Sequence, residues 1–353
     1  MPQDYCEEIA NIIEQYRLRN RKKGCLNVEF DKSHVERWVS QFDNHHEIIL
    51  QETFKLLNEY YFSKENIEEY LTGIYSSTKI WGKDIEQAIS NTIFLNCQTK
   101  GNSQDRLYKK SRKIILDLYG IDIEDCDSDA TSFVYVDDCM FSGNTVRKDM
   151  EKLIRKVPNG STINTIFMVV HSFAEWWIQQ SLKDSIKENN INFDIWRCKT
   201  IQNSGGRNHS YECLWPQEYE SENVSDYINT LKDESDMTPG KKVRLFRESI
   251  YSGGVYTSED SRAILEQELM EAGLKIISFS DNNKRFIRPM GYDNRISFGF
   301  GAFFATYMNM SNNCPLAFWW GDANAEPWHP FSKWYPLLPR KANENGGDMF
   351  VWE

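Results

Sequence analysis

Residues 134–145 read Val134-Tyr135-Val136-Asp137-Asp138-Cys139-Met140-Phe141-Ser142-Gly143-Asn144-Thr145. An apolar run leads into two carboxylates, and a short loop of small polar residues then precedes a helical stretch that ends near Lys156. The pattern predicts a strand over 132–136, a turn and a helix. In open α/β sheets, ligands bind beyond the carboxyl ends of the strands. Backbone N–H groups of such a loop, together with the positive end of the helix, favour an anion.

The residue types of this segment suit a phosphorylated sugar. Gly143 allows a ligand to approach the backbone closely, and Ser142 and Thr145 add hydroxyl donors. The adjacent carboxylates of Asp137 and Asp138 suit the vicinal hydroxyls of a ribose, or a hydrated Mg²⁺ ion. A phosphate site beside a diol site is the layout of ribose 5-phosphate. The alternative interpretation is a charged turn at a strand end that binds nothing.

A second strand, glycine-containing loop and helix precede the first. The apolar run 92–97 leads into the loop 98–103, and a helical stretch follows over 104–119. This spacing predicts one βαβ step between the two loops. In the loop, Lys100 would supply positive charge, and Gly101, Asn102 and Ser103 would supply backbone donors. The alternative is an ordinary surface turn.

Two further apolar runs, 162–170 and 191–197, alternate with helical stretches. Repeated strand–loop–helix units predict a parallel α/β sheet with right-handed crossovers, and continuous apolar strands predict helices on both faces.

The remaining regions differ in their pattern of apolar and polar residues. Residues 1–90 carry helical apolar stripes, 91–202 form the predicted α/β core, 203–262 form a polar surface insertion, and 263–353 form an α+β region. Within these, we expect a helix over 259–272 that Gly273 ends, and then a strand over 274–279.

Composition narrows the classes of partner. The chain has 353 residues, with 41 Lys+Arg against 52 Asp+Glu and a net charge of −11. This balance argues against broad nucleic-acid binding, which depends on cations that neutralise phosphates. No CxxC pattern occurs among the eight cysteines. The amino terminus does not resemble a signal peptide, and no apolar run is long enough to span a membrane. We therefore expect a cytoplasmic protein with no membrane partner.

The segment 134–145 resembles the phosphoribosyl-pyrophosphate signature of type I phosphoribosyltransferases. The resemblance implies a Rossmann-like parallel sheet with an amino-terminal helical region and a carboxyl-terminal hood-like region. It implies that Asp137 and Asp138 hold the ribose hydroxyls. The residues that would wrap the 5-phosphate are Ser142, Gly143, Asn144 and Thr145. In that family the earlier loop, here Lys100 to Ser103, binds pyrophosphate. Mg²⁺ held at Asp137 and Asp138 would, with Lys100, neutralise the leaving pyrophosphate.

A narrower resemblance covers residues 38–340. The chain is similar to phosphoribosyltransferase-like effectors of bacterial conflict systems, including those encoded beside retron reverse transcriptases. The segments that carry this resemblance are 38–42, 94–104, the acidic-pair segment, 288–292, 312–320 and 334–340. It implies a toxin effector of antiphage defence, with a reverse transcriptase complex as a partner.

The chain departs from the family at two points. Many purine-transferring members carry an acid just before the Thr/Ser-Gly pair, where Phe141 stands here. The segment that corresponds to their long flexible loop, 121–131, is short and acidic. Three activities therefore stay open: phosphoribosyl transfer, nucleotide glycohydrolysis, and nucleotide sensing without catalysis. A nuclease subunit is a weaker option, because no metal-ligand spacing supports it.

Other candidates lie outside these loops. His171 ends the third predicted strand, where it would contact substrate or serve as a satisfied structural histidine. Arg288 would bind a phosphate or form a structural salt bridge. Trp319 and Trp320 are expected in the core, with a base-stacking wall as the alternative.

Overall fold

The computed structural model describes residues 3–22, 26–97, 103–126, 130–203, 212–238, 240, 243–247, 255–279 and 286–340. Contacts divide these residues into two compact units. Residues 64–201 form the first, here called the sheet unit. Residues up to 63 and residues from 202 to 340 together form the second, here called the mixed unit.

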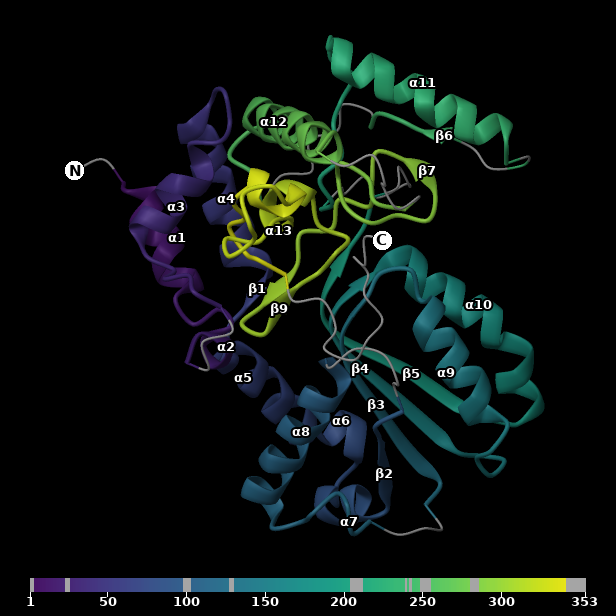
Figure 1. Cartoon of the computed structure of the whole chain (residues 1–353). Helices are drawn as coiled ribbons and strands as arrows, with labels where there is room; N and C mark the ends of the chain where they lie inside the picture. The colour runs from purple at the N-terminus through teal and green to yellow at the C-terminus, as the bar shows by residue number, and fades with distance from the viewer. Residues whose placement is uncertain are drawn as a thin grey trace. The chain divides into compact units, whose positions relative to one another are not determined.

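Four parallel strands form the sheet unit's centre, in the order β2-β3-β4-β5 (Figure 1). The strands are β2 (Thr92–Leu95), β3 (Ser132–Met140), β4 (Thr162–His171) and β5 (Asn192–Ile201). Their register is continuous, since Leu95 lies opposite Tyr135 and Thr165 lies between Tyr135 and Ile195. The predicted parallel sheet is confirmed, and each of the four predicted strand segments overlaps an observed strand.

Helices α9 (Asn144–Ile154) and α10 (Ser172–Glu188) cover one face of this sheet. Each contributes apolar side chains at a spacing of four residues, which places them along one side of the helix. From α9 and α10 these are Val146, Met150, Ile154, Ala174, Ile178 and Leu182, and from the strands they meet Phe133, Tyr135, Ile163 and Phe167.

The other face is covered by α5 (Lys64–Tyr75), α6 (Thr78–Trp81) and α8 (Ser103–Tyr119), with α7 (Ile85–Ser90) leading into β2. The rings of Tyr75 and Trp81 lie 6.0 and 6.4 Å from that of Phe94 on β2. The Tyr75 hydroxyl donates to Ser111 Oγ on α8 at 2.6 Å. These contacts hold α8 on the face opposite to α9 and α10.

The placement of α8 corrects one prediction. The chain advances across the sheet in one direction from β2 to β5, yet α8 lies on one face and α9 and α10 lie on the other. Successive crossovers of one hand in one direction would place all three helices on the same face. The prediction of uniformly right-handed crossovers is therefore wrong for this sheet.

The mixed unit contains segments from both the amino-terminal and the carboxyl-terminal parts of the chain. Its helices are α1 (Tyr5–Ile13), α2 (Leu18–Lys22), α3 (Lys32–Val39), α4 (His46–Tyr60), α11 (Glu222–Asp236), α12 (Glu259–Ile277), α13 (Leu316–Trp319) and a 3₁₀ turn (Pro330–Lys333). Its strands are β1 (Tyr61–Phe62), β8 (Ala305–Thr306) and β9 (Asn309–Met310) in one sheet, and β6 (Val243–Arg244) with β7 (Ile296–Ser297) in another. Trp38 stacks on Phe318 at 5.5 Å and donates its indole N–H to Ala317 O at 2.9 Å.

The boundaries of the two units differ from those of the four regions expected from the sequence. Residues 64–90 group with the sheet because α5 and α6 pack on β2. The predicted surface insertion also contributes to the core, since Cys213 and Leu214 are fully buried. Leu214 N donates to Gly301 O at 2.8 Å.

The strand predicted over 274–279 is also wrong, because α12 continues to Ile277. Gly273 does not end this helix. A Cβ at Gly273 would stand 2.6 Å from Pro289 O, so the glycine permits a close approach between α12 and the segment that follows it.

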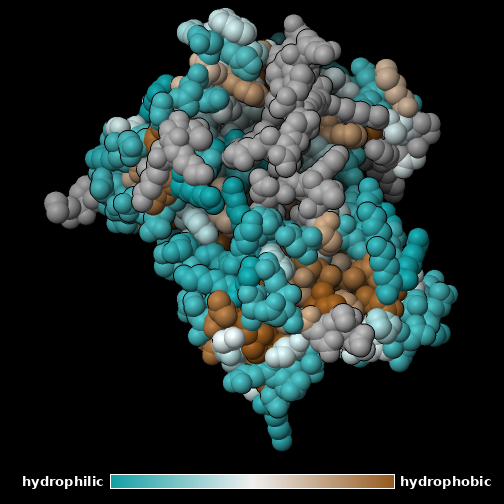
Figure 2. All heavy atoms as spheres, turned by 60° about the horizontal axis from the view of Figure 1, so that its bottom comes forward, coloured by the Kyte–Doolittle hydropathy of each residue, from teal (hydrophilic) through white to brown (hydrophobic). Residues whose placement is uncertain are grey.

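The coloured part of the face shown in Figure 2 is mostly hydrophilic, with some hydrophobic patches. Among the described residues, the exposed large hydrophobic side chains are Leu116, Leu118, Phe173, Trp176, Met237 and Trp328. No helix in the described ranges combines the length and apolarity that crossing a membrane requires.

Candidate functional site

The acidic pair lies inside strand β3, near its carboxyl end, and not in the loop beyond it. The strand extends to Met140, and Asp137 lies opposite Phe167 while Cys139 lies opposite Val169 on β4. The prediction that the strand ends at 136 is therefore wrong. Met140 and Phe141 are buried, and their burial extends the strand past the two charges.

Asp137 is 6 % exposed and is fixed by two hydrogen bonds. Its Oδ1 accepts from the hydroxyl of Ser103 at 2.8 Å and from the backbone N–H of Asp138 at 2.9 Å. Ser103 is the first residue of α8, so the bond joins the end of the earlier loop to the acidic pair. The structure thus brings together two segments that the sequence predicted to share one sheet edge. Lys100, Gly101 and Asn102 lie outside the described residues.

The loop after β3 turns through Gly143, which has a φ of 71° and forms the N-cap of α9. A Cβ at this position would lie 3.1 Å from the side chain of Ile178 and 3.4 Å from that of Trp177, both on α10. The loop therefore lies directly against α10. Glycine adopts this left-handed conformation without the strain that other residues incur.

The start of α9 has the features of an anion site. Ser142 and Thr145 are exposed, and the Ser142 hydroxyl accepts from the N–H of Asn144 at 3.4 Å. Gly143 has no side chain that could cap the helix, and the first turn of α9 has no acidic residue. The positive end of a helix stabilises a phosphate through its N–H groups. The first turn of α9 therefore has no carboxylate that would compete with a phosphate for these N–H groups.

Two further side chains at this edge were missed by the sequence interpretation. Gln104 is fully buried, and its Oε1 accepts from the N–H of Cys97 at 2.9 Å, which fixes the carboxyl end of β2. Asp149 on α9 accepts from the Tyr135 hydroxyl at 3.3 Å, and burial raises the pKa of its carboxyl group. The pKa of Cys97 is raised to about 11 by desolvation of the thiol and then by the charge of Asp149. The signal that could have found Gln104 is its position as an amide in the first turn of the helix after the loop.

The outlying candidates have structural partners. His171 is 1 % exposed, and its Nδ1 accepts from Phe173 N at 3.2 Å as the N-cap of α10. Arg288 belongs to the mixed unit, where it donates to Glu234 at 2.8 Å. Trp319 and Trp320 are buried, and Trp319 Nε1 donates to Cys314 O at 2.7 Å. The expected core placement of the two tryptophans is confirmed.

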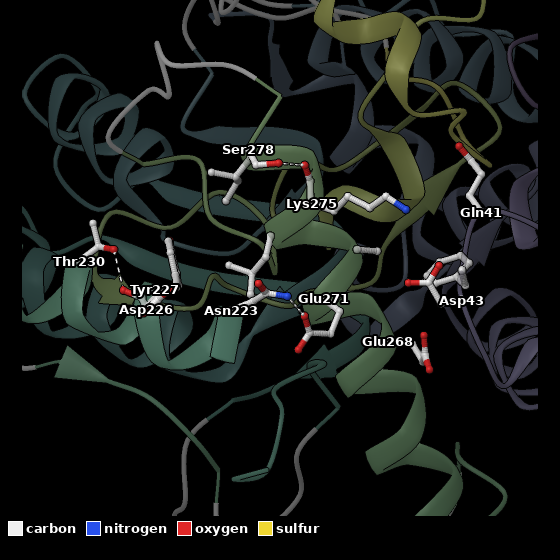
Figure 3. Close-up of a pocket in the computed structure, with 14 residues that line it drawn as sticks. Gln41, Asp43, Asn223, Asp226, Tyr227, Thr230, Glu268, Glu271, Lys275 and Ser278 are labelled. Carbon is white, nitrogen blue, oxygen red and sulfur yellow. Dashed lines mark hydrogen bonds between the residues drawn. The ribbon is translucent and has the colours of Figure 1, made fainter. Parts of the chain in front are cut away.

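A cavity of about 710 Å³ lies in the mixed unit between the end of α3 and helices α11 and α12 (Figure 3). Its lining includes four carboxylates and one lysine: Asp43, Asp226, Glu268, Glu271 and Lys275. Tyr219 and Asn223 both donate to Glu271 at 3.1 Å, and His45 pairs with Glu268 at 2.8 Å. This charge disfavours a phosphorylated ligand, so the cavity is not a second version of the β3–α9 site.

The family model PRTase-CE matches residues 35–340. The chain belongs to the PRTase-CE family. It therefore has a phosphoribosyltransferase-like domain, and the match includes the sheet unit and most of the mixed unit. No curated protein and no solved structure matches the chain.

Proposed function

We propose that this PRTase-CE protein binds a ribose 5-phosphate ligand at the edge formed by β3 and α9. The observation that carries the proposal is the direct bond from Ser103 to Asp137, beside the glycine turn that begins α9. The N–H groups of the loop would hold the 5-phosphate, with the hydroxyls of Ser142 and Thr145 as further donors. Asp137 and Asp138 would accept the ribose hydroxyls.

The reaction proposed at this site is transfer or hydrolysis at ribose C1. The bond from C1 to its leaving group breaks with its electron pair on the leaving group. Water or another acceptor then adds to C1 and loses a proton, which the leaving group or the solvent takes up. The cationic ribosyl species in between is stabilised by fixed negative charge nearby, which the two carboxylates would supply.

Mg²⁺ would suit the β3–α9 site as an ion that binds together with the phosphorylated ligand. Mg²⁺ usually binds through one or two carboxylates together with substrate phosphates, and Asp137 and Asp138 are such donors. Within the described residues, no group of three or more His, Cys, Asp or Glu side chains forms a ready metal cage. When bound, Mg²⁺ would neutralise charge on a leaving pyrophosphate, to which Lys100 would add its own charge.

A second candidate function is nucleotide sensing without catalysis. Phe141 stands where purine-transferring relatives have an acid, and it is 6 % exposed. A buried aromatic ring at this position cannot move the proton of a leaving base. In this alternative the same edge binds the nucleotide and a partner, such as a reverse transcriptase complex, responds to it.

An activity assay with a matched control separates the two. Purified protein is incubated with Mg²⁺ and either a nucleoside monophosphate or phosphoribosyl pyrophosphate, and released base or pyrophosphate is measured. Asp138→Asn should lower the rate by roughly 100-fold, because it removes charge near C1 and keeps the volume. Asp184→Asn, at an exposed position in the second half of α10, should leave the rate unchanged. Binding without turnover in the wild type would favour the sensor.

The proposed role in antiphage defence is tested with the same variants in cells. If the protein is a toxic effector, its expression should arrest growth, and Asp138→Asn should abolish the arrest while Asp184→Asn keeps it. Undiminished arrest in Asp138→Asn, at equal protein levels, would show that toxicity does not act through this site.

A further inference from the structure

The side of α10 that faces away from the sheet carries two aromatic rings and two lysines. The residues of this helix that pack on the sheet recur every four positions, at Ala174, Ile178 and Leu182. Residues about half a turn from these positions therefore point away from the sheet. They include Phe173, Trp176, Lys183 and Lys187, which are all exposed.

The two aromatic rings are neighbours on this side of the helix. Phe173 is 51 % exposed, Trp176 is 54 % exposed, and their ring centroids are 5.5 Å apart. Among the described tryptophans, only Trp328 is exposed to a similar or greater extent. Contact between large rings and water is unfavourable, and a group of such rings on a surface indicates an interaction site.

Helix α9 lies beside α10 and adds three cations to the same surface (Figure 1). The two helices are in contact, since the guanidinium of Arg147 is 5.5 Å from the ring centroid of Trp177. The buried residues of α9 recur every four positions from Val146 to Ile154, so the opposite side of the helix points outward. That side carries the exposed Lys148, Lys152 and Arg155. These three cations and the four exposed residues of α10 are here called the α9–α10 face.

The α9–α10 face has an excess of positive charge. Among the described residues, none of its five cations belongs to an ion pair. Of the acids on the two helices, Glu151 and Glu175 already pair with arginines, and Asp149 accepts a hydrogen bond from strand β3. Asp184 and Glu188 are the exposed acids of these helices. The face is therefore positive, although the chain as a whole has a net charge of −11.

We propose that the α9–α10 face binds single-stranded nucleic acid. Its cations would contact the phosphates of the strand, which carry the complementary charge. Phe173 and Trp176 would stack on the bases, which a surface aromatic ring can reach only where they are not paired in a duplex. Every base offers a π-face, so the surface recognises a strand and not a sequence. The face points away from the sheet, so this proposal does not depend on the proposed function of the β3–α9 site.

Fluorescence anisotropy of a labelled oligothymidine of about twelve nucleotides tests the proposal, at about 50 mM and about 200 mM salt. The wild type should bind this strand, and log Kd should rise by about 3 per unit of log salt if all five cations contact phosphates. A duplex of the same length should bind more weakly, because its bases are not free to stack on the two rings.

Two sets of variants separate stacking from charge. Trp176→Ala should weaken binding by roughly 5- to 100-fold, and Trp176→Phe should restore most of the affinity. Trp328→Ala removes an exposed tryptophan of the mixed unit and should change nothing. Lys183→Gln should lower the salt dependence by about 0.7. Lys83→Gln, at an exposed lysine outside the face, should leave the salt dependence unchanged.

All these variants change exposed side chains, so they should remain folded, and thermal unfolding of each variant checks this. If the wild type does not bind the oligothymidine at the lower salt, the proposal is overturned, and an acidic protein segment becomes the better partner for this face. Equal effects of Trp176→Ala and Trp328→Ala would overturn the proposal as well. So would equal affinity for the single strand and the duplex, because the rings would then have no role.

Discussion

Replacing Glu266 with alanine should lower the free energy of unfolding of the mixed unit by about 3–5 kcal/mol, the usual cost of breaking a buried ion pair. Glu266 is fully buried on α12, and its carboxylate accepts from two arginines. Arg247 donates to Oε2 at 2.9 and 2.7 Å, and Arg262 donates to Oε1 at 2.9 Å. The variant would leave two guanidinium groups in the core with Glu259 as the remaining carboxylate partner within the described residues.

The backbone also depends on this carboxylate, since Trp215 N donates to Glu266 Oε1 at 2.9 Å. Urea denaturation measures the loss. Glu220→Gln, at an exposed position of the same unit, should stay within about 0.5 kcal/mol of the wild type. A loss below about 1 kcal/mol for Glu266→Ala would mean that the arginines find other partners and that this network does not hold the unit together.

Gly143→Ala should abolish most binding of ribose 5-phosphate, with a loss of about 100-fold or more. The new methyl group would shift the loop whose backbone N–H groups are proposed to hold the phosphate, and the ligand would lose charge-assisted hydrogen bonds. The methyl group would also press on Ile178 at 3.1 Å, which moves the loop. Stability should fall by about 1–2 kcal/mol, because alanine at positive φ is strained.

Gly120 is a matched control for this strain. Its φ is 69°, close to the 71° of Gly143, and a Cβ there would meet nothing within 4 Å. Gly120→Ala should therefore lose similar stability and bind ribose 5-phosphate normally. If both variants bind alike, the loop at Gly143 does not contact the phosphate, and the ligand site must be sought elsewhere.

The parts of the fold that depend on local patterns could be predicted from the sequence. Continuous apolar runs such as 162–170 identify buried strands, and loops with glycine and hydroxyl residues identify the turns between strand and helix. The closeness of Ser103 and Asp137 follows from the same reasoning, because parallel strands end at one edge.

The parts that depend on distant contacts could not be predicted in this way. Contacts with residues distant in the sequence, such as the bond from Tyr75 to Ser111, hold α8 on its face of the sheet, and the local pattern of α8 does not indicate them. Gly273 resembles a helix end in sequence but packs inside α12 against Pro289. The end of β3 was misplaced because charge usually ends a strand, whereas the burial of Met140 and Phe141 continues it.

The most direct test of the central claim is a thermal shift measurement of ribose 5-phosphate binding in the presence of Mg²⁺. At 100 times its Kd, the ligand should stabilise the wild type by about 2.7 kcal/mol. Asp137→Asn retains an acceptor for Ser103 and for Asp138 N but loses the charge, so it should remain folded and show a much smaller shift. A wild-type protein that shows no shift with ribose 5-phosphate, AMP or phosphoribosyl pyrophosphate would contradict the account.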